Sequence, residues 1–218
     1  MPRALFEKRG NALYISHLDL MRVFQRAFKR AGLALTHTNG FNPRPSVSIA
    51  LPLSLGVESG CELLDFELDG QNVSNEEICR RLNESLIDGV CVLSVYDEAR
   101  KLKELAYLDC RLNMEYDGGI PEGAQERIRA LFDRPSIILE KKGKNGVTDQ
   151  EIIPMIRSVN VEVSGREICL SARICCQNPS LNPMQLSAAV TKYLPDLKPD
   201  FVRCCRIEVY DTKEIVFR

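Results

Sequence analysis

The order in which hydrophobic periodicity changes along the chain constrains its fold more than any other feature of the sequence. Strand-like segments occur at Arg3–Phe6, Val47–Leu53, Leu64–Leu68 and Val90–Val95. Helical periodicity separates them, over His17–Ala31 and again after Ser74. The order strand, helix, strand, strand, helix, strand predicts a ferredoxin-like (split βαβ) half over residues 1–100.

Local signals define the ends of the expected elements. Ser16 and Ser74 each precede an acidic residue by three positions, the spacing of a capping box that satisfies the first free amides of a helix. Gly32 predicts the end of the first helix, because glycine readily adopts the left-handed conformation found there. We also expect the first strand to continue through Leu13–Ile15, and a turn at Gly56–Gly60.

The second half of the chain repeats this order with one strand more. We expect helices over Pro121–Phe132 and from Asn182 onward. The expected strands are Ala106–Tyr116, Ser136–Glu140, Val159–Val163, Glu167–Ile174 and Val202–Tyr210. The sequence therefore predicts an α+β protein with two ferredoxin-like halves and antiparallel sheets, over residues 1–100 and 101–218, the second half with an extra strand.

The net charge of −1 conceals a strong asymmetry between neighbouring segments. Residues 1–50 hold eight basic and two acidic side chains, whereas residues 51–100 hold three basic and eleven acidic ones. Both histidines, His17 and His37, also lie in the first segment. A protein this neutral overall is not a general polyanion binder, but a patch built from the first fifty residues can still bind phosphates.

That basic segment supplies the candidate site. Four cations recur on the expected first helix, opposite its apolar stripe, and a Gly-Phe-Asn-Pro loop follows. Cationic side chains contact phosphates, Asn and Ser supply hydrogen bonds, and Phe41 can stack on a base. The candidate nucleic-acid or substrate-binding residues are His17, Arg22, Arg26, Lys29, Arg30, Asn42, Arg44 and Ser46.

The alternative is an ordinary solvated helix face that the acidic segment Glu62–Asp69 neutralises. The alternation of this segment places Asp65, Glu67 and Asp69 opposite its apolar side. Because the helix should cover the apolar side, we expect these carboxylates on the other face of the sheet. The basic helix face would then stay free, unless the second half of the chain covers the sheet.

Signatures of catalysis, metals and membranes are missing from the sequence. The nine cysteines are odd in number and contain no C-x-x-C pair, which favours small buried hydrophobes over disulfides or metal ligands. No nucleotide-binding, metalloprotease or hydrolase motif is present. With no membrane-length apolar run and no signal peptide, we expect a cytoplasmic protein without cofactor or metal.

Several segments resemble a bacterial domain of unknown function. They are Lys8–Gly10, Leu13–Arg22, Arg26-Ala27, Arg30–Leu33, Gly40–Pro45, Ala50–Leu53, Gly56–Ser59 and Glu62–Asp65. The family is known as the radical-SAM-associated domain because it is usually fused to, or encoded beside, a radical SAM protein. Its neighbourhood also includes a ribonuclease of the E/G type and ribosomal protein genes. Arg44 stands where the family leads us to expect histidine, and Glu151–Pro154 replaces an expected Asp-Ile-Arg-Pro.

The resemblance implies a context more than a reaction. Because the chain lacks the three-cysteine cluster motif, it is not itself a radical SAM enzyme. We expect a non-catalytic accessory protein that binds RNA, or presents a substrate, to a radical SAM partner, with ribosome-related factors as further candidate partners. Two alternatives stay open: a metal-independent endoribonuclease of the tandem ferredoxin-like type, with His17 or His37 as base, and a purely structural adaptor.

Overall fold

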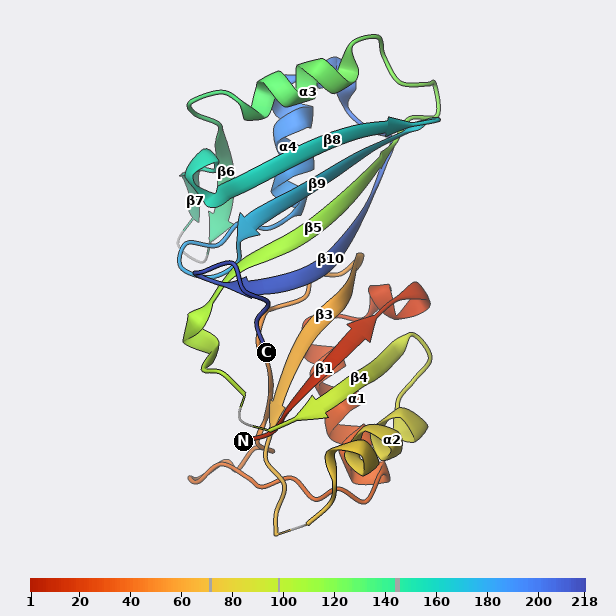
Figure 1. Cartoon of the computed structure of the whole chain (residues 1–218), viewed down its shortest axis with the longest axis vertical. Helices are drawn as coiled ribbons and strands as arrows, with labels where there is room; N and C mark the ends of the chain where they lie inside the picture. The colour runs from red at the N-terminus through yellow and green to blue at the C-terminus, as the bar shows by residue number, and fades with distance from the viewer. Residues whose placement is uncertain (71, 98, 144–145) are drawn as a thin grey trace. The chain divides into compact units, whose positions relative to one another are not determined.

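The chain forms two compact units with mixed α and β structure (Figure 1). The structure is a computed structural model that describes residues 1–70, 72–97, 99–143 and 146–218. Unit 1 consists of Met1–Glu104 together with Phe217–Arg218, and unit 2 consists of Leu105–Val216. The α+β class with antiparallel strands is as predicted.

Unit 1 contains two helices and an antiparallel sheet. Its sheet order is β4-β1-β3-β2, and α1 and α2 follow β1 and β3 in the chain. The elements are β1 (Arg3–Lys8), α1 (His17–Arg30), β2 (Val47–Ile49), β3 (Val57–Phe66), α2 (Asn75–Ser85) and β4 (Val90–Tyr96). The side chain of Asn83 joins α2 to β4, because it donates to the Val92 carbonyl and accepts from the Val92 amide, both at 2.8 Å.

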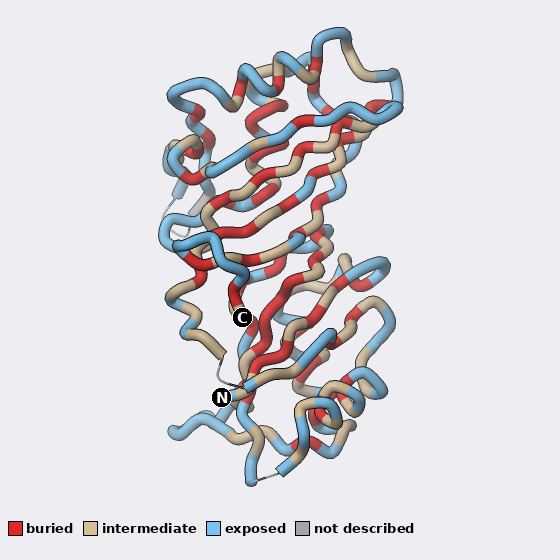
Figure 2. The backbone as a smooth tube through the Cα atoms, viewed as in Figure 1, coloured by how far each residue is buried: buried red, intermediate tan, exposed pale blue. Residues whose placement is uncertain are grey.

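Aromatic side chains hold α1 on this sheet. The rings of Phe24 and Phe6 lie 4.7 Å apart edge to face, and those of Phe28 and Phe66 lie 5.0 Å apart. All four side chains are fully buried. The i, i+4 spacing of Phe24 and Phe28 places both rings on one side of α1, so the opposite side faces solvent. Figure 2 shows this difference in burial: β1 and β3 are mostly buried, whereas the helices have exposed segments.

Both predicted helix starts in unit 1 are confirmed. The Ser16 hydroxyl accepts from the Asp19 amide at 3.2 Å and donates to its carboxylate at 2.7 Å. The Ser74 hydroxyl accepts from the Glu77 amide at 3.3 Å. The predicted glycine at the end of α1 is also confirmed, since Gly32 adopts φ +67°, a conformation that favours glycine.

Three strand predictions in unit 1 are wrong at their ends. Leu13–Ile15 is not a strand, because a 3-10 helix at Gly10–Tyr14 ends there and the buried Lys8 ammonium donates to the Ile15 carbonyl at 3.0 Å. The expected turn at Gly56–Gly60 is mostly strand, since β3 starts at Val57 and only Gly56, with φ +75°, turns the chain. β2 ends at Ile49, well before Leu53.

Asp65 lies as the alternation predicts, whereas Glu67 and Asp69 follow the end of β3 at Phe66. Asp65 sits between the buried Leu64 and Phe66 but faces the other side of the sheet, where it pairs with Arg3 at 2.6 Å. Phe217 covers this pair, with the Arg3 guanidinium 5.4 Å from the centre of its ring. Among the described residues, no carboxylate of Glu62–Asp69 pairs with a cation of α1.

Within unit 2, antiparallel strands lie in the order β10-β5-β9-β8. Its elements are β5 (Leu105–Glu115), α3 (Ala124–Phe132), β6 (Ile138–Gly143), β7 (Gly146–Glu151), β8 (Ile156–Ser164), β9 (Glu167–Cys175), α4 (Met184–Tyr193) and β10 (Phe201–Asp211). Further 3-10 turns occupy Ile153–Met155 and Pro195–Leu197, and another, Leu102–Glu104, ends the main segment of unit 1. The fully buried Ile128, Leu186 and Val190 lie on the inner sides of α3 and α4.

The predicted extra strand of unit 2 does not join its main sheet. Among the described residues, Ile138–Gly143 pairs only with Gly146–Glu151, as a separate two-stranded hairpin. The partner strand escaped prediction because its side chains are polar and mostly exposed, so they show no alternation. The Glu151 carboxylate ends the hairpin by accepting from the Ile137 amide at 2.8 Å and the Ile153 amide at 3.1 Å.

The cysteines are all free thiols, of which Cys61, Cys110 and Cys204 are buried and the other six are half-buried. Burial raises the pKa of Cys204 to about 12 and also raises that of Cys110. Because the thiolate is the reactive form, we expect Cys204 to be alkylated about a thousandfold more slowly than a thiol of ordinary pKa at pH 8. Mass spectrometry after a timed iodoacetamide pulse measures this.

In urea all nine cysteines should react together. Labelling of Cys204 in the folded protein as fast as the half-buried Cys169 would show that its burial is transient.

Among the helices of the described ranges, none is long and apolar enough to cross a membrane.

Candidate nucleic-acid interface

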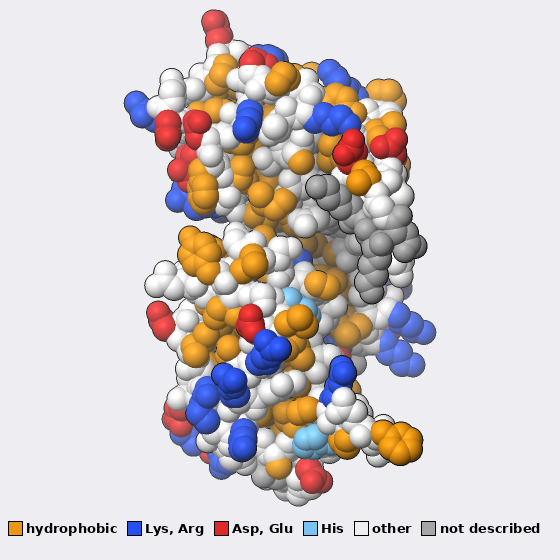
Figure 3. Space-filling view, turned by 180° about the vertical axis from the view of Figure 1, so that it is seen from behind, with side chains coloured by type: hydrophobic (Ala, Val, Ile, Leu, Met, Phe, Trp, Pro, Cys, Tyr) orange, Lys and Arg blue, Asp and Glu red, His pale blue; other side chains and the backbone are white. Residues whose placement is uncertain are grey.

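The solvent side of α1 is a cationic surface. Arg22, Arg26, Lys29 and Arg30, here called the α1 cationic face, are all exposed and lie opposite the buried stripe of the helix. Figure 3 shows Lys and Arg side chains gathered over the helical side of unit 1. Most of the predicted cations of the site thus share one surface.

These four cations differ in what they contact. The Arg22 guanidinium donates to the Asp19 carboxylate at 2.7 Å, and Arg30 donates to the carbonyl of Ser85 at the end of α2. The Ser16 hydroxyl, followed by Arg22, lowers the pKa of Asp19. Arg26 and Lys29 make no hydrogen bond or ion pair with another described residue. The centre of the face is therefore open to an external anion.

His17 does not lie on the cationic face. It is the first residue of α1 and half-buried, and it precedes the buried Phe24 by seven residues, or about two turns. Its Nδ1 atom is enclosed and has no hydrogen-bond partner among the described residues. The imidazole therefore points to the inner side of the helix, away from the predicted contact surface.

The Gly-Phe-Asn-Pro loop forms a tight structure of its own. The Thr38 amide donates to the Arg44 carbonyl at 2.8 Å, and the Arg44 amide donates to the Thr38 hydroxyl at 3.0 Å. Phe41, Asn42 and Arg44 are exposed, and the side chains of Asn42 and Arg44 have no partner within the described part of the chain. Figure 1 shows this loop projecting from the lower end of unit 1, away from α1.

Ser46 has a structural place beside β3. Its amide donates to the Thr36 carbonyl at 2.8 Å, and its carbonyl accepts from the Glu67 amide at 3.1 Å. These bonds tie the base of the loop to the end of β3. The predicted site thus resolves into the α1 cationic face and a separate loop with Asn42 and Arg44.

The two histidines belong to different segments of unit 1. His17 begins α1 and His37 follows its end, and a helix of 14 residues is about 20 Å long. General acid and base groups act within hydrogen-bond reach of one substrate. Across the residues that the structure describes, no three His, Cys, Asp or Glu side chains are grouped so that they could hold a metal ion.

Sequence reasoning missed a polar constellation on the open face of the unit 2 sheet. The Arg173 guanidinium on β9 binds the Asp109 carboxylate on β5 through two bonds of 2.8 and 2.9 Å, and Glu214 through one of 2.6 Å. It also lies 3.9 Å from the centre of the Tyr210 ring. Hydrogen bonds to Asp109 raise the pKa of Arg173, and burial raises that of Tyr210. The alternation of β5 placed Asp109 on the polar side of the strand but did not indicate its partner.

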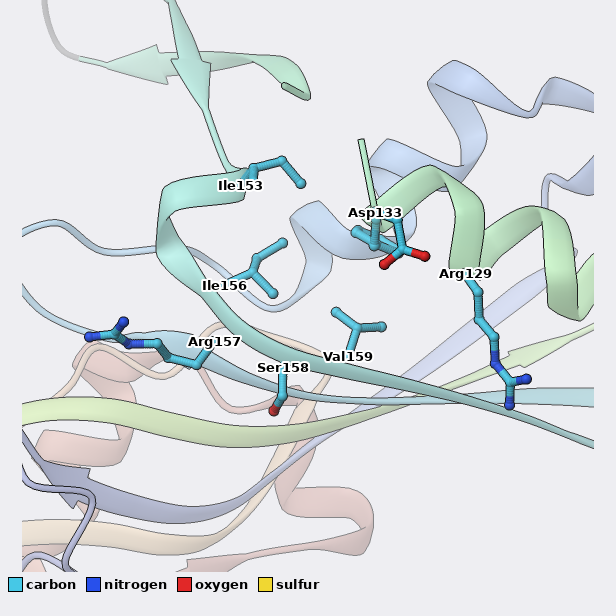
Figure 4. A pocket seen from close by; sticks show the side chains of 8 residues that line it. Arg129, Asp133, Ile153, Ile156, Arg157, Ser158 and Val159 are labelled. Atoms are coloured by element: carbon cyan, nitrogen blue, oxygen red, sulfur yellow. The ribbon is translucent and has the colours of Figure 1, made fainter. Parts of the chain in front are cut away.

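Unit 2 also contains a pocket of about 340 Å³ between α3 and β8 (Figure 4). Ile153, Ile156 and Val159 give it an apolar lining. Both arginines at its rim are engaged elsewhere: Arg129 donates to the Val161 carbonyl at 2.8 Å, and Arg157 donates to the Tyr107 hydroxyl. The pocket lies in a different unit from the α1 cationic face and contributes nothing to it.

The family of the protein follows from a match over most of the chain. Residues 2–183 match a family described as an uncharacterized protein conserved in bacteria (DUF2344). The chain belongs to this family. The prediction of a bacterial domain of unknown function is therefore confirmed. No curated protein matches this DUF2344 chain.

The DUF2344 chain is similar in fold to parts of solved structures. A chain in the crystal structure of a Cbf5-Nop10-Gar1 complex is 11% identical, with a TM-score of 0.52, over 95% of this chain and 48% of that chain. A chain of the archaeal box H/ACA sRNP Nop10-Cbf5 complex is 10% identical, with a TM-score of 0.43, over 94% and 46%. The DUF2344 chain thus spans about half the length of these chains. At such identity the first likeness shows the fold alone.

An unknown protein from Galdieria sulphuraria is 12% identical, with a TM-score of 0.25, over 94% of this chain and 96% of that chain. Neither this likeness nor the one to the archaeal complex bears on the function of the DUF2344 protein.

Proposed function

We propose that this DUF2344 protein binds RNA through the α1 cationic face and acts as a non-catalytic accessory partner of a radical SAM enzyme. The observation that carries the RNA proposal is the open centre of that face, where Arg26 and Lys29 make no hydrogen bond or ion pair with another described residue. The radical SAM partner rests on the resemblance of the segments around α1 and the Gly-Phe-Asn-Pro loop to the radical-SAM-associated domain.

The dimensions of the face suit a nucleic-acid backbone. Arg22 and Arg30 are eight residues apart, which is about 12 Å along a helix. In a duplex the phosphates of one strand follow each other at roughly 3.4 Å of rise, so the face has the length of three to four of them. The salt bridge of Arg22 is exposed and weak, with side-chain exposures of 65% for Arg22 and 56% for Asp19, so a phosphate can compete for the arginine.

The strand order of both units supports their assignment as two ferredoxin-like halves. If the four main-sheet strands of each unit are numbered in chain order, both sheets run 4-1-3-2 with antiparallel neighbours. In each unit a helix follows the first strand and another follows the third. We therefore keep 1–100 and 101–218 as the proposed domains, with the β6–β7 hairpin as an insertion in the second. RNA and a radical SAM partner would place the protein in the cytoplasm.

The charge of α1 should control RNA affinity. We expect the triple variant R22E/R26E/R30E to bind a single-stranded oligoribonucleotide at least a hundredfold more weakly than the wild type in a filter-binding assay. Each substitution removes a phosphate contact and adds a repelling charge.

A variant with the same change in net charge provides the control. Lys101, Lys103 and Lys198 are exposed and lie outside α1, so K101E/K103E/K198E should stay within about threefold of the wild type. Equal loss of affinity in both variants would mean that net charge, and not the α1 cationic face, governs binding. Unchanged affinity of R22E/R26E/R30E would refute the proposed face outright.

A further inference from the structure

The open face of the unit 2 sheet contains a hollow of about 300 Å³ that crosses all four strands. Its polar lining comes from Arg111 on β5, Ser158 and Asn160 on β8, and Ser171 on β9, and Ile207 on β10 adds an exposed apolar side chain. Asp109 and Arg173 also line it. This volume is at the lower end of the range for small-molecule sites.

Two of the charges in the hollow are already paired. The bidentate contact between Asp109 and Arg173, at 2.8 and 2.9 Å, satisfies both groups, and the Tyr210 ring and Glu214 fix the guanidinium further. The Asp109 carboxylate is thus compensated from within the fold. The charge left to meet a ligand in the hollow is that of Arg111.

Arg111 is exposed and has no partner among the described residues. In the register of the sheet it stands opposite Ser171, which in turn stands opposite Asn160. Neighbouring strands lie about 4.8 Å apart, so this row offers a guanidinium, a hydroxyl and an amide across roughly 10 Å. The Asn160 amide is oriented by a 2.9 Å bond to Glu162. A guanidinium with neighbouring hydroxyl donors is the chemistry that binds phosphate.

We propose that this hollow binds a phosphate monoester, with the phosphoryl group on Arg111 and Ser171 and the alcohol portion against Ile207 and Asn160. A continuous polyanion fits poorly, because carboxylates lie on the same face next to the hollow: in the register, Glu162 stands one row, and Glu115 and Glu167 two rows, beyond Arg111. Arg203 offsets this charge only in part, since it is one cation paired with two carboxylates, Glu115 at 3.0 Å and Glu167 at 2.7 Å. A single terminal phosphate stays within reach of Arg111 and avoids these carboxylates.

The test is a titration of ¹⁵N-labelled full-length protein with ribose 5-phosphate, followed by NMR. We expect saturable shifts centred on the amides of Arg111, Ser171 and Asn160, and no such shifts with ribose. Arg111→Gln should weaken binding at least tenfold, and Arg111→Lys, which keeps the charge but loses the fork of donors, should weaken it less. Arg134→Gln, an exposed change on unit 2 outside the hollow, should stay within twofold.

Two further arms assign the source of the phosphate. The first arm is competition by a 5′-phosphorylated trinucleotide, with its 5′-hydroxyl form as control. If only the phosphorylated form displaces ribose 5-phosphate, and does so at lower concentration, the ligand is an RNA end. If the trinucleotide does not displace ribose 5-phosphate, the ligand is a small metabolite. Binding of ribose 5-phosphate should survive in R22E/R26E/R30E, so loss of RNA binding through α1 leaves this inference intact. Shifts confined to other surfaces, equal shifts with ribose, or unchanged affinity of Arg111→Gln would overturn it.

Discussion

Replacement of Phe24 by alanine is expected to lower the free energy of unfolding by about 3–5 kcal/mol. The Phe24 side chain is fully buried between α1 and the sheet, and its ring packs edge to face against Phe6 at 4.7 Å. Truncation removes this burial and the ring contact, and leaves a cavity that the rigid sheet cannot fill. Urea unfolding followed by circular dichroism at 222 nm measures the change.

Lys29→Ala on the same helix is the matched control. Lys29 is exposed and has no partner among the described residues, so its loss should change the free energy of unfolding by no more than about 0.5 kcal/mol. If Phe24→Ala were equally mild, α1 would not be held by this core. The position of the α1 cationic face would then lose its structural basis.

Replacement of Asp65 by alanine is expected to lower the free energy of unfolding by about 3 kcal/mol or more, because it leaves the buried Arg3 guanidinium without its counter-ion. Arg3 is 2% exposed and binds Asp65 through bonds of 2.6 and 3.1 Å. Its remaining Nη1 atom already has no hydrogen-bond partner within the described residues, and the Phe217 ring covers the group. Little else nearby can compensate the charge.

A double variant separates the charge from the packing. R3M/D65L replaces both partners with apolar side chains and should recover most of the stability that Asp65→Ala loses. The exposed pair of Arg80 and Glu84 is the control, and Glu84→Ala should leave the urea midpoint unchanged within error. If the double variant were as unstable as Asp65→Ala, the loss of stability would come from disturbed packing and not from the unpaired charge of Arg3.

Helix positions were predictable because their signals are local. The capping hydroxyls of Ser16 and Ser74, the glycine at position 32 and the apolar stripe of α1 each depend on a few neighbouring residues. Strand ends were less predictable because pairing across the sheet decides them. β3 begins at Val57, within a stretch rich in small polar residues, since its β1 partner extends to Lys8.

The candidate site was predictable only in part, for a related reason. Helical periodicity correctly placed Arg22, Arg26 and Lys29 on one face of α1. The loop that follows α1 in the sequence was expected to extend this face, but it projects away from the helix. The pairing of Asp109 with Arg173 joins residues 64 positions apart. Alternation marked Asp109 as polar, but only the register of the sheet names its partner.

The salt dependence of RNA affinity tests the central claim most directly. The logarithm of the association constant should fall linearly with the logarithm of salt concentration, because each cation that contacts a phosphate releases a counterion. In the neutral variant R22Q/R26Q/K29Q we predict that the slope becomes shallower by about two to three, one step of roughly 0.7–0.9 for each lost contact. Parallel lines for the variant and the wild type would contradict RNA binding through the α1 cationic face.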